Sequence, residues 1–208
     1  MTSLGRRAPK SKDETRIQVV CRQAKLLGQS GRYRDAQDLL LDLDRQYPNR
    51  GEVWQILGWT YKRQQPPKVT DAQYAFARAE QLGRRRTDLY WHWAELEEQF
   101  GSPGAAVAIA ERGLTELQPS VSLNARAASA RIARAQTELD FGQAEADLVR
   151  AQELIAKGFD LPLERYESPG LRRILTELSL RATRRLAEVR DARSARDRSM
   201  TDRQNRRG

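Results

Sequence analysis

The sequence predicts an all-α fold: a right-handed α-solenoid of about four helix–turn–helix repeats, followed by a C-terminal capping helix. Small or apolar residues recur at steps of four and three residues, which is the spacing of one helix face. These sets recur at intervals of 36, 34 and 38 residues, as expected where neighbouring helix pairs stack to bury their apolar faces. The sets are Ala36, Leu40 and Leu43; Ala72, Phe76 and Ala79; Ala106, Ala110 and Gly113; and Ala144, Leu148 and Ala151.

Turn-forming residues divide the chain into these repeats. Gly31 lies between two apolar stretches of the first repeat, and Tyr47-Pro48-Asn49 closes it. An insertion at residues 64–68 accounts for the longer spacing that follows. In the fourth repeat, residues 124–135 are rich in alanine and lack aromatic side chains, which is typical of a terminal repeat that caps a stack. The repeats occupy residues 17–50, 51–86, 87–120 and 121–158.

A last helix is predicted over residues 168–190. Ser168 is a capping residue, and Pro169 suits the first helical position. Its apolar positions form one stripe, which we expect to cover the open end of the fourth repeat. The stripe fades after residue 190, so we expect residues 191–208 to be a disordered basic tail and residues 1–16 a disordered basic arm. The stripe consists of Leu171, Ile174, Leu175, Leu178, Ala182, Leu186 and Val189.

The positive charge is concentrated at the two ends of the chain. Net charge is +9, and residues 171–208 hold 12 arginines against 5 acidic residues. Residues 17–170 are nearly neutral, at −1. This distribution predicts basic arms that meet an acidic partner, rather than a body that coats nucleic acid. The arginines expected to contact an acidic partner or a nucleic acid are Arg84, Arg85, Arg86, Arg193, Arg196, Arg198, Arg203, Arg206 and Arg207.

For the triplet at residues 84–86, an alternative stays open. These arginines follow the end of a helix, where solvated cations are favoured by the negative end of the helix dipole even without a binding partner.

The first three repeats resemble known repeat families. The residues that resemble tetratricopeptide repeats are Gly31, Tyr33, Ala36 and Pro48 in the first repeat, then Trp54, Leu57, Gly58, Tyr61 and Ala72 in the second. The residues that resemble the half-tetratricopeptide (HAT) repeat are Trp91, Trp93, Ala94, Glu97, Gly101, Ile109, Glu111, Arg112 and Leu114 in the third. The first resemblance implies an array that binds partners in a concave groove. The second implies a scaffold in an RNA-processing assembly.

The tetratricopeptide register implies a groove lined by the first helix of each repeat. Its expected residues are Arg22, Lys25 and Gln29; Gln55, Trp59, Lys62 and Arg63; and Trp91 and Glu95. Trp59 is either an aromatic anchor for a partner or a packing residue between repeats. Of Trp91 and Trp93, one belongs to the core and the other to the groove or to inter-repeat packing. Lys25 and Trp59 replace the asparagines of chaperone-binding members, so capture of a chaperone tail is not expected.

No pattern in the sequence favours catalysis. His92 is the only histidine and Cys21 the only cysteine, and no glycine-rich phosphate motif occurs. We therefore expect no enzyme activity, no metal and no cofactor. The longest uncharged run, residues 100–110, is too short to cross a membrane, and no signal peptide is apparent, so we expect a cytoplasmic protein.

Two functions follow from these features. The first is a non-catalytic scaffold or adaptor that binds a peptide or helix of a protein partner in the groove, with Arg-rich arms for an acidic partner. The alternative is an RNA-associated protein of the HAT and tetratricopeptide type, acting in RNA processing or on a ribonucleoprotein.

Overall fold

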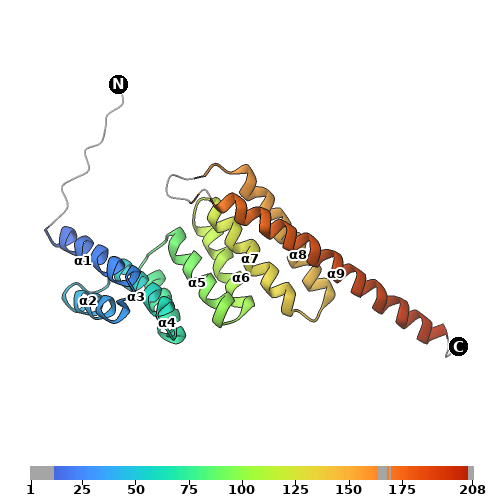
Figure 1. Ribbon diagram of the computed structural model, residues 1–208, viewed down its shortest axis with the longest axis horizontal. Coiled ribbons are helices and arrows are strands. Elements are labelled where there is room, and N and C mark those ends of the chain that lie inside the picture. The colour runs from blue at the N-terminus through green and yellow to red at the C-terminus, as the bar shows by residue number, and fades with distance from the viewer. Residues whose placement is uncertain (1–11, 164–167, 169, 206–208) are drawn as a thin grey trace, which may run out of the picture. The chain divides into compact units, whose positions relative to one another are not determined.

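The protein is all-α, as the sequence predicts. The computed structural model describes residues 12–163, 168 and 170–205, which form nine helices and no strand (Figure 1). The chain divides into two compact units, Met1–Arg84 and Arg85–Gly208, hereafter the first and second units. The helices are α1 (Lys12–Gln29), α2 (Tyr33–Gln46), α3 (Gly51–Arg63), α4 (Val69–Gln81), α5 (Thr87–Phe100), α6 (Pro103–Glu116), α7 (Val121–Thr137), α8 (Phe141–Asp160) and α9 (Leu171–Asn205).

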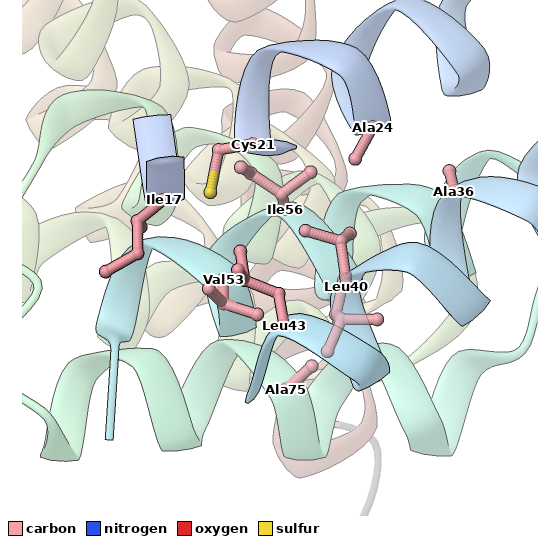
Figure 2. Packing of buried hydrophobic residues seen from close by; sticks show 10 residues of the cluster. Ile17, Cys21, Ala24, Ala36, Leu40, Leu43, Val53, Ile56 and Ala75 are labelled. Carbon is pink, nitrogen blue, oxygen red and sulfur yellow. The ribbon is translucent and has the colours of Figure 1, made fainter. Parts of the chain in front are cut away.

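The first unit contains α1 to α4. Helix α1 packs against α2 and α3, α2 against α3, and α3 against α4. The apolar face of each helix meets in one core, part of which Figure 2 shows. Helices α3 and α4 come unusually close at Gly58, where an added Cβ atom would lie 2.6 Å from Cδ1 of the buried Phe76 ring. A small residue is therefore required at this position.

The second unit contains α5 to α9. Helix α5 packs against α6 and α7, and α6 packs against α7. Helix α9 lies along both α7 and α8, and its apolar stripe from Leu171 to Val189 is buried except at Ile174, which is 39% exposed. None of the described helices is both long enough and apolar enough to cross a membrane.

The helices at both ends differ from the expected bounds. Helix α1 begins at Lys12, inside the arm predicted to be disordered, and α9 continues to Asn205 instead of ending near residue 190. The prediction of a disordered tail over residues 191–205 was therefore wrong. Alanine and arginine are good helix formers, and Arg190 and Arg193 both bind Glu145 of α8, which holds α9 in place at the turn just beyond the predicted end. The rest of the two arms, residues 1–11 and 206–208, lies outside the described residues.

Cys21 is buried in the core of the first unit, beside Ile17 and Ile56 in Figure 2. Burial raises the pKa of its thiol to about 12, and the carboxylate of Glu52 adds to the effect. Because the thiolate is the reactive form, we expect a disulfide reagent at about pH 8 to label native Cys21 at least about tenfold more slowly than the same thiol in urea. Equal labelling rates in the native and unfolded protein would contradict this burial.

Candidate partner-binding site

The first unit exposes a basic face built from α1 and α3. Arg22, Lys25 and Gln29 are exposed and share one side of α1, because they follow at steps of three and four. Trp59 and Arg63 are one turn apart on α3, and Arg63 is exposed. We call these five residues the Trp59 face. Helix α1 carries no acidic residue after its first turn, so no carboxylate on α1 neutralises this face.

Trp59 joins the two helices of this face. An added Cβ atom on Gly28 of α1 would lie 2.4 Å from Cζ3 of the Trp59 ring, so the ring packs directly on that glycine. The guanidinium carbon of Arg63 lies 6.0 Å from the centre of the same ring. Of the two roles expected for Trp59, the observed contacts are those of packing between neighbouring repeats, and only part of the half-buried ring is left to a partner.

Gln55 and Lys62 do not stand on this face, and their assignment to an open groove was wrong. They are only 5% and 7% exposed. Gln55 accepts a hydrogen bond of 2.6 Å from Nε of Arg84 through its Oε1 atom. The physical reason is crowding: α1, α2 and α4 all pack around α3, so only a narrow strip of α3 remains accessible.

In the second unit, Trp91 and Glu95 belong to an internal cluster centred on Arg126 of α7. The Arg126 guanidinium lies 4.2 Å from the centre of the Trp91 ring. It also forms ion pairs with Glu95 at 3.4 Å and Glu98 at 3.1 Å, and Ser129 donates a hydrogen bond to Glu98. Arg126 is only 8% exposed, so the expected groove residues of α5 are occupied by the chain itself.

The two tryptophans of α5 separate as expected of residues two apart on a helix. Trp93 is the core residue, 9% exposed, with the Arg112 guanidinium 5.4 Å from its ring centre. Trp91 is half-buried and lines a cavity of about 670 Å³ with Leu117 of the loop after α6, Ser122 of α7 and Leu171 of α9.

The arginine triplet at residues 84–86 is bound within the chain. Arg84 donates to Gln55 and lies 3.9 Å from a carboxylate oxygen of Glu52. Arg85 pairs with Glu116 of α6, and Arg86 lies 3.5 Å from Asp88. These contacts reduce what Arg84 and Arg85 can offer to a polyanion, whereas the Arg86 side chain is 59% exposed.

The arginines of α9 divide into two groups. Arg193 lies 3.1 Å from Glu145 of α8, and the Arg196 guanidinium lies 6.0 Å from the centre of the Phe141 ring. Hydrogen bonding from Arg190 and Arg193 lowers the pKa of the Glu145 carboxyl. Arg198 and Arg203 are exposed and form no hydrogen bond or ion pair with the described residues. Arg206 and Arg207 lie outside the described residues.

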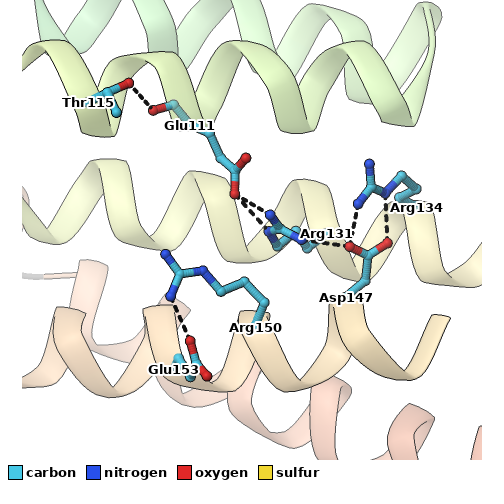
Figure 3. Close-up of polar contacts among 7 residues, drawn as sticks. All are labelled: Glu111, Thr115, Arg131, Arg134, Asp147, Arg150 and Glu153. Carbon is cyan, nitrogen blue, oxygen red and sulfur yellow. Dashed lines mark hydrogen bonds and ion pairs between the residues drawn. The ribbon is translucent and has the colours of Figure 1, made fainter. Parts of the chain in front are cut away.

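A buried carboxylate joins three helices of the second unit (Figure 3). Asp147 of α8 is fully buried, and it accepts hydrogen bonds of 2.7 Å from Arg131 and from Nε of Arg134, both on α7. Arg131 also binds Glu111 of α6. No sequence pattern points to this cluster, because each of its ion pairs joins residues 13 to 20 positions apart on different helices.

Within the described ranges, no three histidine, cysteine, aspartate or glutamate side chains are placed to hold a metal ion. His92 lies 3.6 Å from Glu95. Comparison of the sequence with protein-family models finds no match, and comparison with curated proteins finds none either.

Proposed function

We propose that the chain is a non-catalytic scaffold: a right-handed α-solenoid of about four tetratricopeptide-like and HAT-like repeats, capped by α9, that binds an acidic protein partner. The packing pattern supports the repeat assignment. Within each unit, an odd-numbered helix packs against the even-numbered helix that follows it and against the next odd-numbered helix. The pattern occurs for α1, α5 and α7, and these are the helix contacts expected of a stacked array.

The Trp59 face carries the proposal. It presents the exposed side chains of Arg22 and Lys25 on α1 and of Arg63 on α3. The half-buried Trp59 ring packs on Gly28, with the Arg63 guanidinium 6.0 Å from its centre. Exposed ion pairs contribute at most about 1 kcal/mol each, so several must act together, and an extended acidic segment of a partner can meet all three. The ring adds apolar contact at the centre, which is where binding energy concentrates in interfaces.

We expect the triple variant Arg22→Glu, Lys25→Glu, Arg63→Glu to reduce partner binding about tenfold, because attraction for an acidic segment becomes repulsion. Crosslinking in cells, followed by identification of bound proteins and RNA, measures the effect. Binding of a recovered partner is then quantified with the purified proteins.

A matched control changes the same charge elsewhere on the first unit. Lys12, Arg16 and Arg34 are exposed and lie off the Trp59 face, so the triple glutamate variant at these positions is expected to bind as the wild type does. If both variants lose binding equally, net charge alone governs it and the Trp59 face is not the site.

One observation favours the alternative, an RNA-associated protein: α9 holds ten arginines against five acidic residues over 35 residues. RNA binding by these arginines would weaken steeply with salt, because each phosphate contact releases a counterion. It would also fall when residues 190–208 are deleted. Protein crosslinks that survive this deletion and are lost in the Trp59-face variant would favour the scaffold over the alternative.

A further inference from the structure

Helix α9 is longer than the structure that it packs against. Its residue Arg196 faces Phe141, the first residue of α8, and nine more helical residues follow. At 1.5 Å per residue, residues 197–205 extend about 13 Å beyond that point. Figure 1 shows this end of α9 projecting past α8. We call residues 197–205 the overhang; residues 197–204 are exposed.

The overhang continues the buried stripe of α9 in register. The stripe position Val189 is followed at steps of four and three by Arg193, Arg196, Met200 and Arg203. This face of α9 thus changes from apolar to basic near Phe141, the first residue of α8. By helical periodicity Asp191 and Asp202 lie on the opposite side of the helix, whereas Asp197, four residues after Arg193 and three before Met200, borders the continued face.

The first turns of α8 show which chemistry fits this face. Glu145 forms ion pairs with Arg190 at 2.7 Å and with Arg193 at 3.1 Å, and the Arg196 guanidinium lies over the Phe141 ring. The basic part of the stripe is thus matched by a carboxylate, Glu145, and an apolar side chain, Phe141. These two residues are four positions apart on α8, which runs antiparallel to α9. Beyond Phe141, Met200 is 54% exposed, and nothing in the described chain plays this role for it or for Arg203.

We propose that the overhang binds an acidic amphipathic helix of a partner protein, in line with α8. Such a helix would place carboxylates against Arg196 and Arg203 and an apolar side chain on Met200. Leu139, 89% exposed in the turn before α8, borders the same end of α8 and can cover the apolar side of the incoming helix. This inference rests on the scaffold function proposed above and names the chemistry of one partner element.

The charge pattern favours a protein helix over nucleic acid. Residues 190–205 hold five arginines and three aspartates, a mixed pattern with little net attraction for a phosphate backbone. Only Arg193, Arg196 and Arg203 continue the stripe, and these three lie on one side of the helix. A second copy of this chain would present arginines to arginines if the two overhangs met, which repels.

A fluorescent synthetic peptide tests the inference on the full-length protein. The peptide has about 20 residues, with glutamates at i and i+4 and leucines on one side, so that it forms an amphipathic helix. Fluorescence anisotropy should show binding that weakens about tenfold in the variant Arg196→Glu, Arg203→Glu. The matched control, Arg181→Glu, Arg198→Glu, has the same net charge and changes arginines off the stripe, and it should alter the affinity less than about twofold.

Three further measurements make the outcome decisive. A peptide with glutamine for glutamate should lose binding, and circular dichroism should show unchanged helix content in both variants. Equal loss of peptide binding in the two variants overturns the inference. So does single-stranded RNA binding that falls only in the Arg196 and Arg203 variant while the peptide does not bind, or self-association that this variant abolishes.

Failure here is distinguishable from failure of the scaffold function. If the peptide does not discriminate the variants but the Trp59-face variant still loses its partner, the overhang inference falls and the scaffold stands. If crosslinking recovers no protein partner at all, the scaffold falls, whatever the peptide does.

Discussion

Replacing Asp147 with alanine is expected to lower the free energy of unfolding of the second unit by about 3 kcal/mol. Asp147 is fully buried and binds both Arg131 and Arg134. Its removal leaves two guanidinium groups without their shared carboxylate at the interface of α7 and α8. The expected loss lies at the lower end of values for broken buried pairs, because Arg131 keeps Glu111 and Arg134 is partly exposed.

Urea unfolding followed by circular dichroism measures this loss. The matched control is Glu153→Ala, which breaks an exposed pair with Arg150 on α8 and should cost less than about 0.5 kcal/mol. In the Asp147→Ala background, Arg134→Met should cost much less than it does alone, because the two residues share one interaction. Additive losses in this cycle would contradict the role of Asp147 as the common partner.

The helices were predictable because their signals are local. The predicted repeats begin at residues 51, 87 and 121, and α3, α5 and α7 begin at those same positions. A turn residue or a capping serine such as Ser120, which accepts a hydrogen bond from the backbone of Leu123, acts within one turn and is visible in the sequence. The continuation of α9 past residue 190 was missed because the turn that holds Arg190 and Arg193 is fixed by Glu145 of α8, 45 and 48 positions earlier in the sequence.

The candidate site was predictable only in part, for a related reason. The register of a single helix places Arg22, Lys25 and Gln29 on one exposed side of α1, where little else packs. The same reasoning fails for Gln55, because the burial of α3 depends on three neighbouring helices. It also misses Arg126, since ion pairs that span about thirty residues leave no periodic trace.

The close approach of α3 and α4 leads to a second large effect. We expect Gly58→Ala to destabilise the first unit by about 2 kcal/mol. The added Cβ atom would lie 2.6 Å from Cδ1 and 2.7 Å from Cε1 of Phe76. Phe76 is fully buried and its ring has no free space, so the two helices must separate. Overpacking of this kind costs up to about 3 kcal/mol, and the better helix propensity of alanine offsets about 1 kcal/mol of it.

Gly28→Ala is the informative comparison, because its added Cβ atom would come even closer to a ring than the one at Gly58. The Cβ atom would lie 2.4 Å from the Trp59 ring, but that ring is half-buried and its obstructing atoms are the far end of the side chain. We expect it to swing outward, so the free energy of unfolding should change by less than about 0.5 kcal/mol. Tryptophan emission should then shift to longer wavelength as the ring enters water, whereas Gly58→Ala should leave it unchanged before unfolding. If Gly28→Ala lowers the free energy of unfolding as much as Gly58→Ala does, Trp59 is fixed by its neighbours, and α1 and α3 form one rigid surface. A small cost with the spectral shift would mean that Trp59 can move, and that the face around it can adapt to the partner that it binds.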